Sequence, residues 1–328
     1  MQRPIARITG LGAAAPATVV TNADLEKRLD TSDKWIVERT GIRERRMLQP
    51  GEALSDLFAA ASGQAMAEAG VGPRDLDAII CGTVTPDRRL PATACEVQAR
   101  LGANRALAFD LAAACPGWLY GLTVAEGLIA SGASGTVLVL GGDRNTSIID
   151  PTDRTTAVLF GDGAGAAVLR PADDGRGILS SVLGADGSLG HLLYIPAGGS
   201  TEPLSEKVVR ERSYYVRMAG REVFKVAVRR MAQACCQALV QAGTTGDQLD
   251  LLVPHQANRR IIEATAKEAG VPMCKVMVNV DRYGNTSAGS ILLALAQARE
   301  EGRLFPGALV ALVSFGAGFT WGAMVMRW

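Results

Sequence analysis

The chain has 328 residues, of which 48% are hydrophobic and 5% aromatic, and its formal net charge at pH 7 is +1. This length allows two domains or one duplicated fold, and the apolar content suffices to bury a core. A net charge near zero gives no general attraction to nucleic acid or to anionic membranes, so we expect neither as a partner.

The N-terminal residues Met1-Gln-Arg-Pro-Ile-Ala-Arg-Ile8 lack the long apolar stretch of a signal peptide, and no apolar run in the chain is long enough to span a bilayer. The six cysteines show no disulfide or C-x-x-C spacing, which favours reduced thiols and a cytoplasmic protein. Only His191 and His255 are histidines, and no Cys/His cluster has the spacing of zinc ligands. We therefore expect no metal site.

Apolar runs typical of buried strands alternate with segments of helical periodicity almost throughout, which predicts an α/β fold. The expected strands cover residues 78–81, 106–111, 136–140, 249–253, 308–314 and 321–327. The expected helices cover residues 54–69, 117–131, 222–242, 258–269 and 287–301. Glycines follow several of these helices, as C-caps do.

The polar stretch Pro171-Ala-Asp-Asp-Gly-Arg-Gly177 is the expected boundary between an N-terminal half, 1–174, and a C-terminal half, 175–328. A second polar segment, 198–213, is interpreted as a surface excursion. Phe160-Gly-Asp-Gly-Ala-Gly165 is echoed by Phe315-Gly-Ala-Gly318, a faint internal repeat. Two halves built alike would bring a residue of the first half toward residues of the second.

Cys115 lies at the first of three expected strand-to-helix junctions, in the segment Ala112-Ala-Ala-Cys-Pro-Gly117. A buried structural cysteine is the ordinary alternative, and we accept it for Cys235 and Cys236 inside a helix. At Cys115, small neighbours leave room for a substrate, and proline suits a first helical turn. The positive end of a helix should favour the thiolate, which is the nucleophilic form.

His255 and Asn285 occupy two further junctions, in Pro254-His-Gln-Ala-Asn258 and Gly284-Asn-Thr-Ser287. Each has an ordinary alternative: a lone loop histidine, and a Gly-Asn turn in which Thr286 or Ser287 caps the next helix. Asn258 could cap the helix after His255. The combination of thiol, imidazole and carboxamide favours an enzyme that carries an acyl group on Cys115.

Two glycine-rich segments are open to a functional interpretation. Gly161-Asp-Gly-Ala-Gly165 leads into a strand and lacks the G-x-G-x-x-G spacing of a dinucleotide loop, which favours a structural role. Gly316-Ala317-Gly318 lies between two apolar strands, where a backbone N–H could point at a thioester oxygen.

At these residues the chain resembles the β-ketoacyl-acyl carrier protein synthases III, the initiating condensing enzymes of bacterial type II fatty acid synthesis. The likeness covers nearly the whole chain and includes the segments around Cys115, His255 and Asn285. Further strings that carry it are Thr31–Arg45, Asp150-Pro-Thr-Asp-Arg154, Phe160–Gly165, Met218-Ala-Gly220 and Phe315–Trp321.

The resemblance implies a thiolase-like, five-layered αβαβα fold from two duplicated halves, working as a homodimer. It also implies the reaction. A short acyl-CoA, such as acetyl-CoA, acylates the cysteine. Malonyl-acyl carrier protein then loses CO2, and its carbanion attacks the acyl-enzyme. Acyl-CoA is a substrate here, and no cofactor is implied.

Site residues follow from the resemblance by position. Cys115, His255 and Asn285 would be catalytic, and the backbone N–H groups of Cys115 and Ala317 would form the oxyanion hole. The expected contacts to CoA and its pantetheine are Trp35, Arg39, Arg154, Arg221, Phe224 and Asn258, with Trp35 and Arg154 sandwiching the adenine. The expected acyl pocket comprises Leu90, Asn145, Phe160, Leu193 and Phe315. The expected carrier-protein contacts are Lys225, Gln256 and Arg260.

The chain departs from the family's usual pattern at several positions. Arg221 stands where asparagine is common, and Glu268 replaces a commonly basic residue. Leu90 stands where acetyl-preferring members often carry a phenylalanine that reaches into the partner's pocket, and Asn145 replaces an apolar residue. These changes leave a longer or branched primer open.

Three other functions are alternatives for this sequence. A papain-like cysteine hydrolase shares the order Cys, His, Asn, but would have a secretory or pro-segment and a glutamine shortly before the cysteine. A condensing enzyme or acyltransferase of secondary metabolism would keep the fold and use another primer or acceptor. A non-enzymatic scaffold would tolerate loss of any of the three residues, yet all three are present.

Overall fold

The computed structural model describes residues 5–172 and 174–328. Residues 1–4, at the start of the segment in which we expected no signal peptide, and residue 173, inside the expected boundary, lie outside the described part. None of the helices in the described ranges is long and apolar enough to cross a membrane.

A five-stranded sheet with the strand order β1-β7-β6-β4-β5 forms one half of the molecule. Its strands are β1 (Ile5–Ala14), β4 (Ala78–Gly82), β5 (Leu107–Leu111), β6 (Val137–Asp143) and β7 (Gly163–Ala172). β4 and β6 are buried along their whole length, as expected of parallel strands covered on both faces. β1 was not among the expected strands.

A second sheet has the order β11-β12-β13-β8. It comprises β8 (Gly177–Ala185), β11 (Leu251–Pro254), β12 (Leu309–Gly316) and β13 (Thr320–Arg327). A parallel bridge from Leu252 to Val276 continues this sheet beyond β11, as β5 continues the first beyond β4. The pairing directions also match, because β7 and β13 are each antiparallel to both neighbours. The two sheets therefore have the same topology.

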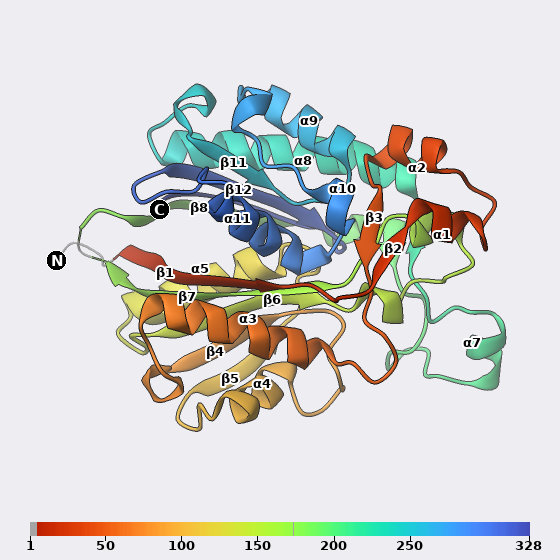
Figure 1. The fold of residues 1–328 in the computed structure, drawn as a ribbon, viewed down its shortest axis with the longest axis horizontal. Helices are drawn as coiled ribbons and strands as arrows, with labels where there is room; N and C mark the ends of the chain where they lie inside the picture. Colours follow the sequence, from red (N-terminus) through yellow and green to blue (C-terminus); the bar gives the residue numbers. More distant parts are fainter. Residues whose placement is uncertain (1–4, 173) are drawn as a thin grey trace.

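Helices form three further layers around the sheets, stacked from top to bottom in Figure 1. The helices α8 (Gly220–Gln241) and α9 (Arg259–Glu268) form one outer layer, with α8 on the second sheet. The helices α3 (Leu54–Ala69) and α4 (Thr93–Leu101) form the other, on the first sheet. Between the sheets lie α5 (Gly117–Ala130) and α11 (Ser290–Glu300), which contact strands of both. The predicted five-layered fold is confirmed.

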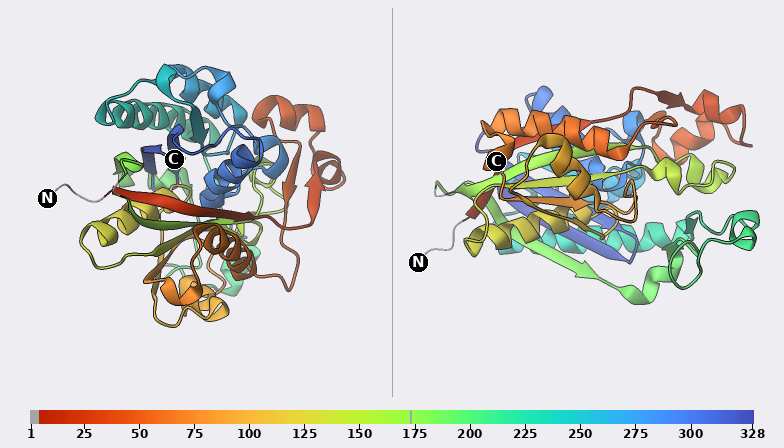
Figure 2. Two further views of the ribbon diagram at one scale, coloured as in Figure 1. Left: turned by 60° about the vertical axis from the view of Figure 1, so that its left-hand side comes forward. Right: turned by 90° about the horizontal axis from the view of Figure 1, so that it is seen from below.

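The shorter elements lie mostly at one end of the molecule. They include α1 (Asn22–Glu26), α2 (Asp33–Thr40), α6 (Arg154–Ala157), α7 (Glu206–Arg210) and α10 (Val280–Tyr283), with the small strand pairs β2 (Val19–Thr21) with β3 (Glu44–Arg46) and β9 (Leu193–Tyr194) with β10 (Arg217–Met218). Figure 2 shows that the segment carrying α7 projects from the same end as α1 and α2. This segment contains the expected surface excursion.

The connection between β7 and β8 leads from the first sheet to the second. The expected boundary at 174/175 falls in this connection. The core between the sheets includes residues of both middle helices, among them Trp118, Leu119 and Leu122 on α5 and Ile291, Leu292 and Leu295 on α11. The middle layer thus packs the halves into one shared core, and treating them as separate domains stays a prediction.

Candidate active site

Cys115 lies between β5 and α5, directly after a residue of unusual backbone geometry. Ala114, its neighbour, adopts a left-handed conformation with φ of 51°. The loop at Gly316 presses on this turn, because a Cβ on Gly316 would lie 2.7 Å from the Cys115 nitrogen. The Thr320 hydroxyl ties the two loops together by donating to the carbonyls of Ala113 at 2.8 Å and Ala317 at 3.0 Å.

The Cys115 thiol is partly exposed to the pocket and receives a hydrogen bond from the Ser287 hydroxyl at 3.5 Å. Burial raises the pKa of this thiol to about 12. Burial thus opposes the stabilisation of the thiolate that we expected from the N-terminus of α5, and it favours the neutral thiol. The thiol is neutral and must lose its proton during acyl transfer.

His255 follows β11 and is fixed by two hydrogen bonds. Its backbone N–H donates to Val313 at 2.7 Å, and its Nδ1 lies 2.6 Å from the Ser290 hydroxyl oxygen. That oxygen also accepts from the Gln256 N–H at 3.4 Å, so the Ser290 hydrogen is available for Nδ1. The ring proton then sits on Nε2. Burial lowers the His255 pKa to about 3, which keeps the ring neutral.

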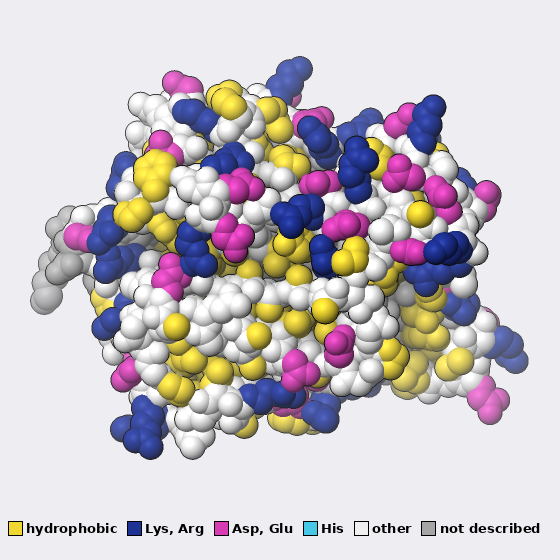
Figure 3. Space-filling view, in the orientation of Figure 1, with side chains coloured by type: hydrophobic (Ala, Val, Ile, Leu, Met, Phe, Trp, Pro, Cys, Tyr) yellow, Lys and Arg dark blue, Asp and Glu magenta, His cyan; other side chains and the backbone are white. Residues whose placement is uncertain are grey.

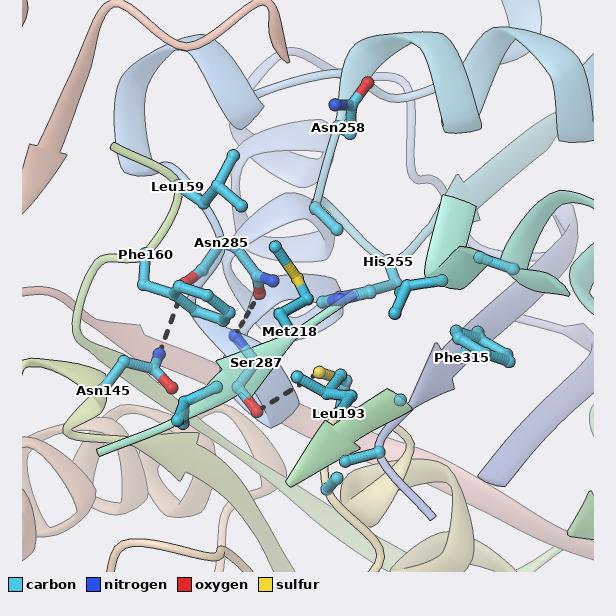
Figure 4. A pocket seen from close by; sticks show the side chains of 18 of the residues that line it. Asn145, Leu159, Phe160, Leu193, Met218, His255, Asn258, Asn285, Ser287 and Phe315 are labelled. Atoms are coloured by element: carbon cyan, nitrogen blue, oxygen red, sulfur yellow. Dashed lines mark hydrogen bonds between the residues drawn. The ribbon is translucent and has the colours of Figure 1, made fainter. Parts of the chain in front are cut away.

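Asn285 is held by its backbone and by its own side-chain oxygen. Its N–H donates to Leu159 at 2.8 Å, and its carbonyl accepts from Gly161 at 3.0 Å. Its Oδ1 accepts from the Ser287 N–H at 2.8 Å. Because Oδ1 is occupied in this way, the amide NH2 group is free to donate on the side facing His255 (Figure 4).

One pocket of about 990 Å3, its open mouth included, is lined by Cys115, His255 and Asn285 together. Three junctions far apart in the sequence thus meet at one place. The backbone N–H of Ala317, also at this pocket, donates to no acceptor in the described residues, as a free oxyanion donor requires. The roles of these residues stay predictions.

The expected acyl-pocket residues divide into two groups. Asn145, Phe160, Leu193 and Phe315 line the pocket (Figure 4). Leu90 does not line this pocket and is 85% exposed. The sequence reasoning missed much of the apolar lining, which further includes Ile148, Ile149, Leu159, Val216, Val223, Ala227, Met231 and Ile261. In the sequence these pocket residues are recognisable only as apolar, and residues of the hydrophobic core are apolar as well.

The expected CoA contacts lie from the pocket to the surface. Phe224 and Asn258 line the pocket, whereas Arg39 and Arg221 are exposed outside it. Asn258 caps α9 as expected, accepting from the Arg260 N–H at 2.9 Å, and its NH2 group donates to the Arg39 carbonyl at 3.0 Å.

Trp35 and Arg154, the residues of the predicted adenine sandwich, contact each other in this structure. The Arg154 guanidinium lies 5.0 Å from the Trp35 ring centroid, so the two groups stack directly on each other. A base inserted between them needs two van der Waals gaps, about 7 Å in all. Arg154 is exposed and bonded to the Asp30 carbonyl at 2.6 Å, so it would have to move for adenine to enter.

Two of the three expected carrier-protein residues are exposed, namely Lys225 and Arg260. Arg260 lies 5.5 Å from the Phe224 ring centroid, beside the pocket. The expected carrier-protein contact at Gln256 is wrong, because this residue is only 1% exposed. Its NH2 donates to the carbonyls of Pro254 and Met277, and its oxygen accepts from the Asn279 N–H. It therefore holds the His255 loop and cannot meet a partner protein.

The sequence reasoning also missed the hydroxyls that surround the three residues. Ser287 was considered only as a helix cap, but the N-cap of α11 is Gly289, and Ser287 is a left-handed residue with φ of 51°. Ser290 was not singled out at all. A serine two residues after the junction asparagine was the available signal for Ser287.

A thiol, a neutral imidazole and a free carboxamide donor at the floor of one pocket in a duplicated five-layered fold define a thiolase-fold condensing enzyme of the acyltransferase type. Comparison with known proteins gives the family. Residues 109–187 match the family model for 3-oxoacyl-[acyl-carrier-protein] synthase III, and residues 239–328 match the model for its C-terminal part.

Full-length relatives agree. The chain is 57% identical to the β-ketoacyl-[acyl-carrier-protein] synthase III of Symbiobacterium thermophilum, over 99% of this chain and 98% of the relative. The crystal structure of the Aquifex aeolicus 3-oxoacyl-[acyl-carrier-protein] synthase III superimposes with a TM-score of 0.92 at 44% identity, covering 98% of this chain and 100% of that one. A priming β-ketosynthase of the R1128 polyketide pathway gives 0.91 at 36%, covering 99% and 96%. The chain belongs to the β-ketoacyl-acyl carrier protein synthase III family.

Proposed function

We propose that this enzyme catalyses the decarboxylative condensation of a short acyl-CoA primer with malonyl-acyl carrier protein, through an acyl-Cys115 intermediate, and so initiates fatty acid synthesis. The observation that carries the proposal is the meeting of Cys115, His255 and Asn285 in one pocket of a chain from this family. The primer is acetyl-CoA or another short acyl-CoA, and the reaction needs no cofactor beyond these substrates.

In the loading step, the Cys115 sulfur attacks the thioester carbon of the primer and CoA leaves. The carbonyl oxygen becomes an oxyanion, which the N–H groups of Cys115 and Ala317 stabilise. The apolar walls of the pocket, including Phe224 and Val223, surround the pantetheine and exclude water. This protects the acyl-enzyme from hydrolysis until the second substrate arrives.

In the condensation step, malonyl-carrier protein enters the same pocket and loses CO2. Its thioester oxygen takes on the enolate charge, which the His255 Nε2–H and the Asn285 NH2 stabilise by donating hydrogen bonds. A neutral histidine suits this role, because its proton stays on Nε2 at physiological pH. CO2 departure generates the carbanion, so no acidic general base is needed. The carbanion then attacks the acyl-Cys115 carbonyl.

The proposed macromolecular partners are the carrier protein and a second copy of the chain. The exposed cations Lys225 and Arg260 adjoin the pocket residues Phe224 and Ile261 in the chain and would meet an acidic carrier. Large apolar side chains are exposed beside the α7 segment, near the lower right of Figure 3, including Tyr194, Ile195, Leu204 and Val209. Arg89, next to Leu90, bonds the Gly198 carbonyl of this segment. A homodimer would cover this surface and present Leu90 to the partner's pocket.

The proposed location is the cytoplasm, where the substrates of this reaction occur. In support, all six cysteines are free thiols.

No group of His, Cys, Asp or Glu side chains in the described ranges could hold a metal ion.

The alternative of a priming enzyme for a secondary metabolite is less well supported. The chain shares 57% identity with the β-ketoacyl-[acyl-carrier-protein] synthase III of Symbiobacterium thermophilum and 36% with the polyketide priming enzyme. The papain-like hydrolase is excluded by the fold.

The proposal is tested by separating the two half-reactions. Cys115→Ser should abolish transfer of the acetyl group from acetyl-CoA, which intact-protein mass spectrometry detects as an added acetyl mass. Asn285→Ala should still be acetylated but should release CO2 from malonyl-carrier protein roughly 10²-fold more slowly. Acetylation of the Cys115→Ser variant at the wild-type rate would refute the nucleophile, and equal losses in both half-reactions of Asn285→Ala would refute the division of roles.

A further inference from the structure

The loading step leaves one proton without an assigned acceptor. Attack by sulfur requires the Cys115 S–H bond to break, and this thiol is neutral in the resting protein. His255 already carries its ring proton on Nε2, because Ser290 occupies Nδ1. The imidazole is therefore arranged as a hydrogen-bond donor to the pocket. Another group has to take the thiol proton.

Ser287 is the polar side chain in contact with the sulfur. Its hydroxyl oxygen lies 3.5 Å from the Cys115 Sγ. Ser287 is only 3% exposed, so bulk water does not take the place of its hydroxyl beside the sulfur. Its left-handed backbone, with φ of 51°, is uncommon for a residue with a side chain. The Ser287 hydroxyl is also within hydrogen-bonding reach of the Asp143 carboxylate, so its one hydrogen can turn from the sulfur to that carboxylate when the thiol donates to the serine oxygen.

Asp143 is fully buried at the end of β6 and pairs with no cation among the described residues. Its two oxygens are unequally satisfied. Oδ1 accepts three hydrogen bonds, from the hydroxyls of Thr83 and Thr85 at 2.9 Å each and from the Val84 N–H at 2.8 Å. Oδ2 accepts a long bond from the Ala288 N–H at 3.4 Å. Oδ2 is thus the oxygen with capacity for a proton.

We propose that Ser287 and Asp143 form a proton relay for Cys115, in which the serine hydroxyl passes the thiol proton to the buried carboxylate as the primer is loaded. The proposal rests on the proposed function. Ser287 contacts the reacting sulfur, and Asp143 acts through Ser287.

The step balances within the site. As the Sγ–C bond to the primer forms, the S–H proton moves to the Ser287 oxygen, and the serine's own proton moves to Asp143 Oδ2. When the tetrahedral intermediate collapses, the C–S bond to CoA breaks and its electron pair goes to the CoA sulfur. The proton returns through Ser287 to that sulfur, which was bonded to the same carbon as Sγ. The products are acyl-Cys115, CoA thiol and the original carboxylate.

The surroundings of Asp143 suit this role. Burial raises the pKa of its carboxyl, which makes it a better proton acceptor than an exposed aspartate. The other titratable groups facing the relay are Cys115, His255 across the pocket and Cys81 on β4, whose pKa burial raises well above its usual value. The Arg144 guanidinium is turned away to the carbonyls of Glu52 and Gln49.

The test is the pH dependence of Cys115 reactivity in Ser287→Ala and Asp143→Asn. The rate of acetylation by acetyl-CoA would be measured from pH 5.5 to 10, together with the rate of iodoacetamide alkylation of the Cys115 peptide, resolved by mass spectrometry from the exposed Cys236 and Cys274. Both variants should react roughly 10²-fold more slowly near pH 7. Their rates should rise with pH toward wild type, because hydroxide replaces the relay.

Two controls separate this chemistry from a structural defect. Asp162 is also fully buried and bonded to a threonine hydroxyl and to backbone N–H groups, but it does not contact Ser287. Asp162→Asn should retain the wild-type pH profile. Thr146→Val, which removes the hydroxyl that donates to Asp162 at 2.7 Å, should likewise retain the wild-type pH profile.

The relay is wrong if either relay variant reacts at the wild-type rate near pH 7, or is slowed by the same factor at every pH. It is also wrong if Asp162→Asn gives the same pH profile as Asp143→Asn. The iodoacetamide arm needs no substrate and therefore tests the relay even if the wild type is not loaded by acetyl-CoA. That last result would instead count against the proposed function.

Discussion

At the scale of single residues, Asn145 is the departure from the family's usual pattern whose contacts the structure defines in most detail. Its NH2 group donates to the carbonyls of Gly161 at 2.7 Å and Asn285 at 3.3 Å. No described residue donates to its Oδ1, and Figure 4 shows this oxygen turned toward the pocket. The acyl pocket therefore contains a hydrogen-bond acceptor that a leucine or similar residue would not supply.

We predict that Asn145→Leu shifts primer preference toward purely apolar acyl groups. Competition between butyryl-CoA and 3-hydroxybutyryl-CoA, read from the masses of the acyl-enzymes, should change by roughly 10-fold in favour of butyryl, since a hydroxyl facing an unpartnered apolar wall loses about 1–2 kcal/mol. Acetyl-CoA is the control substrate, because its acyl group is the shortest of the three. An unchanged ratio of the two longer primers would show that Oδ1 does not contact the acyl chain.

The sequence was sufficient to predict the site residues whose side chains carry the chemistry. It was not sufficient for residues whose role depends on contacts between distant parts of the chain. Cys115 and His255 stand beside prolines after strands, and Asn285 stands beside a glycine after α10, so local pattern and resemblance were enough to select them. Gln256 stands in the same motif as His255, yet its side chain turns into the protein and bonds Pro254 and Met277. No local pattern distinguishes an inward glutamine from an outward one.

At the scale of elements, the site depends on a close approach between the turn before α5 and the loop after β12. Gly316 permits this approach, because a Cβ there would also lie 2.8 Å from the Pro116 Cδ. The loop carries Ala317, whose N–H is the proposed oxyanion donor. The position of that donor relative to the sulfur is thus set by the absence of a side chain at residue 316.

Gly316→Ala should therefore lower kcat by about 10²-fold or more, because the clash with the Cys115 backbone displaces the Ala317 N–H from the oxyanion. Steady-state kinetics with acetyl-CoA and malonyl-carrier protein would measure this. Gly187→Ala is a matched control, since a Cβ at Gly187 meets nothing within 4 Å. Full activity in Gly316→Ala would mean that the loop can shift without cost, and would remove the argument for a fixed oxyanion hole.

Strands were predictable from the sequence where both of their faces are buried. The fully buried strands β4 and β12 are continuous apolar runs, and both were expected within two residues of their observed ends. β1 and β8 were not expected. Both are the edge strands of their sheets, and they contain glycine, serine or arginine residues that break the apolar run. The short helix between 286 and 290 was expected as α-helix, but the left-handed Ser287 delays the start of α11 to Ser290.

At the scale of the whole molecule, duplication places the reactive groups. α5 and α11 are the middle helices of the two halves, and each is preceded by a left-handed residue three positions before its start, Ala114 and Ser287. The repeat seen at Phe160 and Phe315 likewise precedes the equivalent strands β7 and β13, and both phenylalanines line the pocket. The pocket therefore lies where corresponding parts of both halves meet, and the sequence repeat was a trace of that arrangement.

The buried histidine makes the stability of the whole protein depend on pH. The pKa of His255 is about 3 in the folded state and 6.5 for the unperturbed side chain. Between these values the unfolded chain binds more protons than the folded one, so the stability present above pH 6.5 falls as pH is lowered. His255 alone should lower the free energy of unfolding by about 1.6 kcal/mol between pH 6.5 and pH 5, above the range in which carboxylates of lowered pKa such as Asp24 and Asp150 contribute. Urea unfolding at fixed protein concentration would measure this slope, and His255→Gln should flatten it whatever its effect on stability at pH 7. Equal slopes in the two proteins would show that His255 is protonated at little cost in the folded state, and the neutral Nε2–H donor assumed for decarboxylation would then be wrong.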